Sequence, residues 1–482
     1  MPLSRKQIIR DLQSIVGKAQ VSTELSDLKL SSVDRFRRYE SYHNVFSMPL
    51  PAAVVKVTST EQVQKVIEFA NANGVNVVPR TGRSATEGGL ETAQENSIVL
   101  DGSSMNKIID IDITNMQATA QCGVSLQALD DKLRDQGYTT GHSPQSKPLA
   151  QMGGLVATRS IGQFSTLYGG IEDMVIGLEA VFPEGGVTRI KNVPRRAAGP
   201  DIRHIIIGNE GALCFITEVT IKIFKHYPDN NRYLGYTLDN MDTGFEILRR
   251  VMVEGYKPSV ARLYDIEDGD YHFSHFAKDK CVLIFVSEGV KPIADATNNA
   301  IDGIVKEHSE CQQVDGKHIE KWFSHLNWDP ANLAEEKREI LEEKKICHTT
   351  EISANWSALS GIYENVMRKV RAAIPNLLML GAHSSHSYLT GTNLYFVYFY
   401  DVSDVAPSDE LEQCHMVIKK IIVEETIKAG GSMCHHHGVG KHRTHWIKDE
   451  YGSSYYILDA LKETYDPNGI MNAGTIYPLE KD

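Results

Sequence analysis

The sequence predicts a protein of two or three domains with an α+β or α/β architecture. The chain has 482 residues, which is too long for a single small core. Strand-like runs of branched and aromatic residues alternate with amphipathic helical patterns along most of the chain. Hydrophobic residues make up 41% and charged residues 23% of the chain, as in a soluble globular protein.

The charge and the cysteines narrow the class of protein. The formal net charge is −12, and no block of Lys and Arg stands out, so nucleic acid and anionic membranes are poor candidate partners. No apolar run approaches the roughly 20 residues that span a bilayer. Seven cysteines are scattered without a CxxC pair, which predicts reduced thiols, a cytoplasmic location and no bound metal.

The first part of the chain predicts strands joined by short helices. Residues 1–45 have a charged helical pattern, and 51–59 form a strand pattern. Ser59 and Gln62 indicate a capping box for the next helix, which Gly74 ends before a buried strand over 75–79. Further strands are expected over 97–103 and 116–124, with a helix from Ser125 to Gly137.

From residue 175 the sequence pattern becomes rich in strand-forming residues. Residues 175–190 predict a hairpin with a Gly-containing turn, and 212–224 are rich in strand formers. A turn-rich break at 228–230 marks a domain boundary. Beyond it, helical patterns over 243–255, 292–308 and 358–374 alternate with strand patterns over 259–265, 280–288 and 393–400. These predict a second domain, an antiparallel sheet covered by helices.

A histidine-rich stretch, GGSMCHHHGVGKHR, occupies residues 430–443. Imidazoles exchange protons near neutral pH, and the flanking glycines allow tight bends, which favours an active site. A metal site or an exposed loop is the alternative. In a regular strand His435 and His437 would face one way and His436 the other, so the three could not all serve one site.

Three further loops have small and polar residues that suit ligand binding. PRTGRSATEGGL (79–90) follows a strand and has the composition of a phosphate cradle, or of an ordinary mobile loop. It matches neither a P-loop nor a dinucleotide fingerprint. Residues 140–173 are dense in glycine and hydroxyl groups, which are costly to order unless they surround a ligand. Residues 199–223 contain an Asn-Glu-Gly turn between apolar runs.

Taken together, these stretches resemble one family. PRTGRSA (79–85), TGHSPQS (140–146), GGLVATRSIG (153–162), YGGIEDMV (168–175), GPDIRHIIIGNEG (199–211), GGSMCHHHGVGKHR and YDPNGIMNAG (465–474) occur in the order found in flavoproteins of the vanillyl-alcohol oxidase and p-cresol methylhydroxylase (PCMH) type. Among these the chain is most similar to the alkylglycerone-phosphate (alkyl-DHAP) synthases and their bacterial relatives, the FAD-linked oxidoreductases.

The resemblance implies an α+β fold with a PCMH-type FAD-binding domain over 1–228 and a cap, or substrate, domain over 229–430. Residues 431–482 would return to the FAD domain and complete the active site. FAD would be held without a covalent link, because the 79–90 loop has no Cys or His. The residues implied in FAD binding are Pro79, Arg80, Thr81, Gly82, Arg83, Ser84, Ala85, Gln145, Ser146, Gln151, Gly153, Gly154, Thr158, Arg159, Ser160, Ile161, Glu210, Gly211, Ile216 and Asn472.

The catalytic residues implied by the resemblance are Tyr395, His436, His437, His435 and His142. Tyr395 would act as general acid or base, although a strand tyrosine is ordinarily half of a cross-strand aromatic pair. His435 would support the loop from behind. Arg262, Arg338 and His386 are candidates for binding an anionic substrate, since guanidinium suits carboxylate or phosphate. Arg338 has an alternative as half of an exposed helical ion pair.

Two departures from the family bear on the branch. The synthases have a phosphate loop richer in glycine than this one. The 2-hydroxy-acid dehydrogenase branch has Gly-Glu-His-Gly where this chain has His435-His436-His437-Gly438, and a histidine where this chain has Tyr395. The two differences from the 2-hydroxy-acid dehydrogenase branch favour the synthase-like branch.

The favoured function is that of an FAD-dependent oxidoreductase, a dehydrogenase or oxidase, which takes hydride from a small hydroxylated, anionic substrate. The first alternative is an alkyl-DHAP-synthase-like transferase that uses FAD as a covalent trap. The second is a D-2-hydroxy-acid (lactate or glycolate) dehydrogenase, and a metal-storage role for the histidines is more remote. An electron-transfer flavoprotein or oxygen would accept the electrons, and a homodimer remains open.

Overall fold

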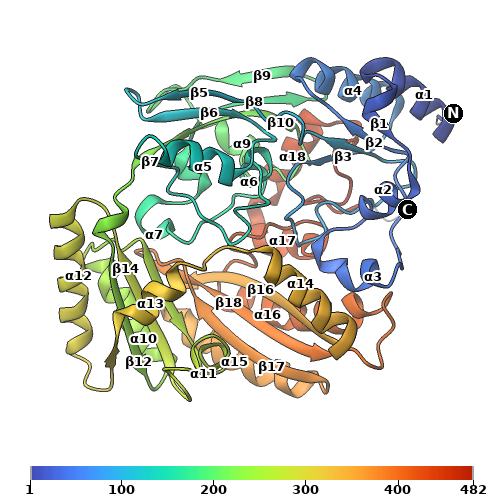
Figure 1. Cartoon of the computed structure of the whole chain (residues 1–482). Helices are drawn as coiled ribbons and strands as arrows, with labels where there is room; N and C mark the ends of the chain where they lie inside the picture. Colours follow the sequence, from blue (N-terminus) through green and yellow to red (C-terminus); the bar gives the residue numbers. More distant parts are fainter. Residues whose placement is uncertain (1–2, 480–482) are drawn as a thin grey trace.

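The computed structural model describes residues 3–479, and its strands form four sheets in two halves of the molecule (Figure 1). Three sheets are built from residues 21–225, and a seven-stranded sheet is built from residues 232–401. Only β2, β4 and β3 pair in parallel, whereas the other named strands pair antiparallel. The α+β class and the two-part arrangement predicted from the sequence are confirmed.

The first sheet has four strands in the order β1-β2-β4-β3, with helices on its flanks. Its elements are α1 (Arg5–Val16), β1 (Val21–Ser22), α2 (Leu25–Leu30), α3 (Arg38–Tyr42), β2 (Ala53–Lys56), α4 (Thr60–Asn73), β3 (Val77–Arg80) and β4 (Ile98–Asp101). At the start of α4 the Ser59 side chain accepts from Gln62 N–H at 3.4 Å. The Gln62 side chain accepts from Thr58 N–H rather than from Ser59, so the expected box is displaced by one residue.

The second sheet has five antiparallel strands in the order β5-β6-β10-β8-β9, and β11 pairs separately with β7. The elements of this part are β5 (Ile108–Asp112), β6 (Gln117–Gln121), α5 (Leu126–Arg134), β7 (Tyr138–Thr139), α6 (Met152–Ala157), α7 (Ser165–Tyr168), α8 (Ile171–Met174), β8 (Val175–Phe182), β9 (Gly186–Ile190), α9 (Arg203–Ile206), β10 (Phe215–Lys222) and β11 (Phe224–Lys225). The expected hairpin over 175–190 is the β8–β9 pair.

The seven-stranded sheet has the order β15-β12-β14-β13-β17-β18-β16. Its strands are β12 (Arg232–Leu238), β13 (Val260–Tyr264), β14 (Cys281–Ser287), β15 (Gln312–Val314), β16 (Lys345–Asn355), β17 (Leu377–Ser384) and β18 (Gly391–Asp401). The accompanying helices are α10 (Met241–Val253), α11 (Ile266–Phe273), α12 (Lys291–Lys306), α13 (Gly316–Phe323), α14 (Pro330–Arg338), α15 (Leu359–Ala373) and α16 (Met416–Lys428).

Strand alternation gives this sheet two different faces. On β18, Leu394, Phe396 and Tyr398 are buried in a core with residues of α10, α12, α15 and α16. The intervening Tyr395 and Val397 point to the other face and line a cavity. The helix-covered face therefore stabilises the sheet, and the opposite face is available for a ligand.

The C-terminal part of the chain returns to the N-terminal sheets, where α17 (Ile447–Tyr451) and α18 (Tyr455–Tyr465) are drawn in red near blue and teal elements (Figure 1). Met471 forms a parallel bridge with Val77 of β3. The Val77 N–H donates to Ile470 O at 2.7 Å, and the Asn472 N–H donates to Val77 O at 2.8 Å. Residues 470–472 therefore pair with β3 at the edge of the first sheet.

Among residues 3–479, no helix has both the length and the apolar character that crossing a membrane requires.

Candidate active site

A cavity of about 750 Å³ lies between the N-terminal sheets and the face of the seven-stranded sheet that carries Tyr395 and Val397. All seven residues of the 79–85 loop line it. So do the other residues predicted to bind FAD, apart from Arg159 and Asn472: Gln145, Ser146, Gln151, Gly153, Gly154, Thr158, Ser160, Ile161, Glu210, Gly211 and Ile216. Segments that lie far apart between residues 79 and 216 thus line the same cavity.

Glycines let the backbone segments of this wall approach one another closely. A Cβ at Gly82 would lie 2.5 Å from Leu149 O and 2.8 Å from Gln151 N. A Cβ at Gly154 would lie 3.0 Å from Thr81 Oγ1. The loop before α6 therefore packs against the 79–85 loop, with backbone groups at the cavity surface. This arrangement fits a phosphate-containing ligand such as FAD.

Unpartnered polar atoms beside the cavity also fit a polar cofactor and substrate. Gln151 Oε1, Arg262 Nε and His437 Nδ1 are buried and have no hydrogen-bond partner within residues 3–479. All three residues line the cavity. Because buried polar groups are nearly always paired in native proteins, a ligand in the cavity could supply the partners of these three atoms.

Three of the predicted FAD-binding residues have other contacts. Arg80 donates to Asp101 Oδ2 at 2.6 Å, so its guanidinium forms a buried ion pair. The Arg159 guanidinium lies 3.6 Å from Glu172. Asn472 donates to Gly89 O at 2.9 Å and to Glu210 O at 2.8 Å, and it therefore fixes the backbone around the cavity rather than lining it.

Tyr395 lies on the cavity face of β18 between two histidines. Its ring stacks on His383 at 4.8 Å between centroids and lies 5.7 Å from the ring of His436. Its hydroxyl donates to Thr349 Oγ1 at 3.1 Å. Burial raises the pKa of Tyr395, so the phenol is protonated at neutral pH.

The histidine stretch is an irregular loop after α16, and one carboxylate holds it. Ser432 pairs with Ser353 of β16. Two residues earlier on that strand, the Glu351 carboxylate accepts the backbone N–H groups of His435, His436 and His437, the last at 2.9 Å. Three successive N–H groups directed to one carboxylate are incompatible with a strand. The strand geometry considered from the sequence therefore does not apply.

A second buried carboxylate, Glu87 of the 79–90 loop, connects the histidine loop to that side of the cavity. Arg443 donates to Glu87 through Nε and Nη2 at 3.1 and 3.0 Å, and to Glu351 O at 2.9 Å. Lys419 donates to Glu87 at 2.5 Å. Burial and these cations act in opposite directions on Glu87, and the cations keep the pKa of its carboxyl well below the usual range.

The imidazoles of His435, His436 and His437 are neutral, because burial lowers the pKa of each. Burial, followed by repulsion from His436, lowers the pKa of His437 to about 3, despite carboxylates at 3.6 Å (Glu351) and 3.9 Å (Glu87) from its Nδ1. Burial lowers the pKa of His435 to about 4. Neutral rings keep a lone pair, which can accept a proton or bind a metal.

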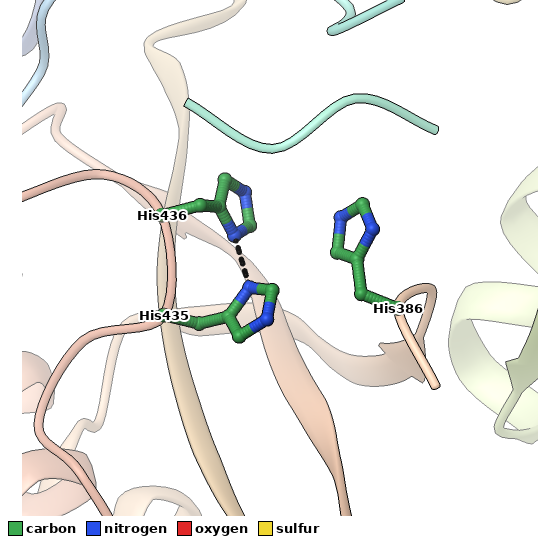
Figure 2. Close-up of side chains that lie close together, drawn as sticks. All are labelled: His386, His435 and His436. Atoms are coloured by element: carbon green, nitrogen blue, oxygen red, sulfur yellow. Dashed lines mark hydrogen bonds between the residues drawn. The ribbon is translucent and has the colours of Figure 1, made fainter. Parts of the chain in front are cut away.

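The structure brings three of the predicted histidines together, as Figure 2 shows for His386, His435 and His436. His386 stacks on His435 with 5.1 Å between centroids, and its Nδ1 pairs with Ser165 Oγ at 2.8 Å. His386, His436 and His437 line the cavity, whereas His435 lies behind them and pairs with Tyr388 OH at 2.7 Å.

The remaining predicted residues divide between the cavity and other places. Arg262 lines the cavity and donates to Tyr264 OH at 2.5 Å and Gln163 Oε1 at 3.1 Å. His142 is buried beside the wall and pairs with Ser160 Oγ at 3.1 Å. Arg338 is not among the cavity-lining residues of the described chain. Its side chain is 40% exposed and pairs with Glu335 and Glu343, as in the helical ion-pair alternative.

Sequence reasoning missed Glu351, Glu87 and Lys419, which position the loop. Glu351 stands within ICHTTEIS, where no motif distinguishes it, and only its position two residues from the Ser353 bridge explains its role. Glu87 offered a weak signal, because an acidic residue in a predicted phosphate loop needs a cationic partner.

Comparisons with known proteins agree with this geometry. Residues 51–191 match the model of an FAD binding domain, and residues 227–476 match the C-terminal domain of FAD linked oxidases. The chain is 62% identical over 484 residues to the "Uncharacterized FAD-linked oxidoreductase YgcU" of Escherichia coli K12, with 100% of each chain covered. It is 27% identical over 466 residues to an alkyldihydroxyacetonephosphate synthase of Caenorhabditis elegans, which covers 89% of this chain and 76% of that one.

Solved structures show the same fold. The match to p-cresol methylhydroxylase with substrate bound has a TM-score of 0.76 at 16% sequence identity, and it covers 99% of this chain and 98% of the other.

Proposed function

Because the chain belongs to the FAD-linked oxidases and is an enzyme with FAD as its cofactor, we propose that it oxidises a small hydroxylated, anionic substrate by hydride transfer. The observation that carries the proposal is the pairing of two proton-handling groups, Tyr395 and His437, on the wall that faces the FAD-fitting loops. Bound FAD supplies a two-electron acceptor at this cavity. The chain's own residues must position the substrate and move its hydroxyl proton.

His437 is placed to accept that proton. Its Nδ1 is buried, unpartnered within residues 3–479 and neutral. The Glu351 and Glu87 carboxylates, at 3.6 and 3.9 Å, stabilise the imidazolium that forms when the proton arrives. Glu351 also fixes the loop through its backbone N–H groups, so the ring is held before substrate binds.

Tyr395 is placed to orient the substrate oxygen. Its protonated phenol lies 5.4 Å from the His437 ring, centroid to centroid, and currently donates to Thr349. A hydrogen bond from the phenol to the substrate hydroxyl would aim that hydroxyl at His437. General acid–base groups of this kind contribute typically about 100- to 10,000-fold to rate.

Arg262 supports an anionic substrate. Its guanidinium lies against the Trp322 ring at 5.4 Å, and its Nε has no partner within residues 3–479. A carboxylate or phosphate would satisfy that donor. We propose Arg262 as the anchor of the anionic group, with Arg338 as part of a surface ion-pair cluster.

A second candidate function is an alkyl-DHAP-synthase-like transfer without net oxidation. It is supported by Tyr395 and the triple histidine, which match the synthase-like branch, and by the 27% identity to a synthase. A D-2-hydroxy-acid dehydrogenase has less support, since Tyr395 and His436 replace residues of that branch.

Anaerobic mixing of the FAD-loaded enzyme with a panel of alcohols and hydroxy acids, free and phosphorylated, tests the proposal. Bleaching of the flavin absorbance by one compound, slowed in the Tyr395→Phe variant, is the expected result. Exchange of an acyl chain for an alcohol, with no net oxidation of the compound, would instead favour the transferase.

A further inference from the structure

Three imidazoles lie close together, two of which line the cavity: Figure 2 shows the His435 and His436 rings joined by a hydrogen bond, with the His386 ring beside them. His435 and His436 come from the loop after α16, and His386 comes from the turn between β17 and β18. The Nδ1 atoms of His435 and His436 lie 2.9 Å apart. One ligand atom from each of the three residues can be chosen so that all lie within 4.8 Å of one another.

These distances are close to those of a metal site. Zn²⁺–N bonds of about 2.0–2.1 Å in a tetrahedral site place ligand nitrogens about 3.3 Å apart. The closest pair, His435 and His436, is hydrogen-bonded at 2.9 Å and would have to separate by about 0.4 Å. The third ring needs at most about 1.5 Å of inward movement, which is the difference between 4.8 Å and that spacing.

Outer hydrogen bonds can set the tautomers that metal binding needs. His386 Nδ1 pairs with Ser165 Oγ at 2.8 Å, which leaves Nε2 free, and in Figure 2 that edge of the ring faces the other two histidines. His435 Nε2 pairs with Tyr388 OH at 2.7 Å, and its Nδ1 shares a hydrogen bond with His436 Nδ1 at 2.9 Å. A metal would replace that hydrogen bond, with the His435 proton held on Nε2 toward Tyr388. Ligating histidines typically donate their other ring N–H to such a partner.

Charge around the cluster is mixed. The Glu351 carboxylate lies 3.9 Å from His436 Nδ1 and favours a cation, whereas Arg262 on the same cavity opposes one.

We propose that His386, His435 and His436 form a binding site for a first-row divalent metal ion, with Zn²⁺ as a fitting member of the class. Imidazole suits Zn²⁺, Ni²⁺, Cu²⁺ and Fe²⁺. His386 and His436 line the cavity, so a fourth coordination position faces the space where the substrate would lie. Three protein ligands with one open position are the arrangement of catalytic metal sites.

This inference departs from the expectation of no bound metal that the cysteine pattern gave. The ligands come from two loops about 50 residues apart, so no short spacing motif in the sequence announces them. The assignment leaves His437 and Tyr395 free for proton handling.

The test uses FAD-loaded protein without a histidine tag, purified away from nickel resin and stripped with a chelator. Zn²⁺ affinity is measured by competition with a chromogenic chelator, and Co²⁺ is added to read its tetrahedral absorption bands. Flavin content and thermal unfolding of every variant are recorded, so that loss of metal is separated from loss of fold or FAD.

One Zn²⁺ per chain is expected in the wild type. His386→Gln, which keeps the side chain's size, and His435→Gln should abolish this site. Tyr388→Phe should weaken it by roughly 10- to 100-fold, as loss of an outer hydrogen-bond partner does. The exposed His445 of the same C-terminal segment provides the matched control, and His445→Gln should bind like the wild type.

Wild-type protein that binds no Zn²⁺ at millimolar concentration would overturn the proposal. So would unchanged affinity in His386→Gln with FAD and fold intact, because the metal would then lie elsewhere. Equal losses in His386→Gln and His445→Gln would also overturn it, since they would indicate binding to histidines in general.

Discussion

The Glu351 carboxylate accepts the backbone N–H of His437 at 2.9 Å and lies 3.6 Å from Nδ1 of the same residue. One side chain therefore fixes both the position and the electrostatic surroundings of the imidazole. Arg443 lies 3.4 Å from the same carboxylate, so removing the Glu351 charge also leaves a buried cation with one fewer partner.

Glu351→Gln should lower the free energy of unfolding by about 3 kcal/mol, because a buried ion pair is broken and an N–H loses its acceptor. Urea unfolding of the FAD-loaded protein measures this. The matched control is Glu342→Gln, whose side chain is 70% exposed and which should change stability by no more than about 0.5 kcal/mol. Equal effects from the two variants would contradict the role of Glu351 in holding the histidine loop.

Gly82→Ala should strongly reduce FAD occupancy, because its Cβ would lie 2.5 Å from Leu149 O and push the two loops apart. Absorbance of the purified protein before and after FAD is added measures occupancy. Gly154→Val should act in the same direction, through the contact with Thr81. Gly361→Ala on α15, where a Cβ meets nothing within 4 Å, is the control and should retain full occupancy.

Tyr395→Phe and His437→Ala should each keep FAD and slow flavin reduction by roughly 100- to 10,000-fold. The double variant should lose less than the product of the single losses, because the two groups act in one step. Stopped-flow reduction with a substrate found in the panel measures all three rates. Wild-type rates in both single variants would place the proton-handling groups elsewhere.

Arg262→Gln should raise the KM for an anionic substrate by roughly 10- to 100-fold, since a hydrogen bond to a charged group is lost. The KM for a neutral analogue should change much less. Arg338→Gln is the matched variant at the other predicted anchor. Because Arg338 lies in an exposed ion-pair cluster, its change should leave both KM values near wild type. A larger effect from Arg338→Gln would reverse the assignment.

Glu210 makes a prediction about pH. Burial raises the pKa of its carboxyl in the folded protein to about 7, although the N–H groups of Val439 and Gly440 act in the opposite direction. The unfolded chain ionises this group near 4.5, so between these values only the folded state holds the proton. Its contribution to stability is therefore greatest at low pH and is lost as pH rises through 7.

The difference in free energy of unfolding between wild type and Glu210→Gln should consequently fall by about 3 kcal/mol between pH 4.5 and pH 8. Chemical unfolding across that range, with FAD at a saturating concentration, measures the slope. A flat difference would show that the carboxyl ionises normally in the folded protein.

The sequence predicted those features that local pattern controls. Ser59 and Gly74 bound α4, and the 175–190 hairpin forms as expected, because caps and turns depend on nearby residues. The family resemblance added the loops predicted to bind FAD, whose residues line one cavity apart from Arg159 and Asn472. No local pattern indicated β16, on which Glu351 and Ser353 lie, because its polar residues face a loop 80 residues further along the chain.

The site was harder to predict where contacts decide the role of a residue. Arg262 and Arg338 are alike in sequence, and only their surroundings separate a cavity residue from a surface one. Asn472 was predicted to bind FAD, and the sequence did not indicate that its amide donates to Gly89 O and Glu210 O. Hydrogen bonds of this kind join segments that are far apart in the sequence, so no residue spacing predicts them.

The bridge between Val77 and Met471 bears on how the protein is made. The edge of β3, which leads into the 79–85 loop, is paired only when residues 470–472 are present. These residues are synthesised about 390 residues after β3. At roughly 5–20 residues per second, that delay is on the order of half a minute to a minute. Cofactor capture should therefore require the synthesis of residues 470–472, and nascent chains halted before residue 470 should fail to retain FAD.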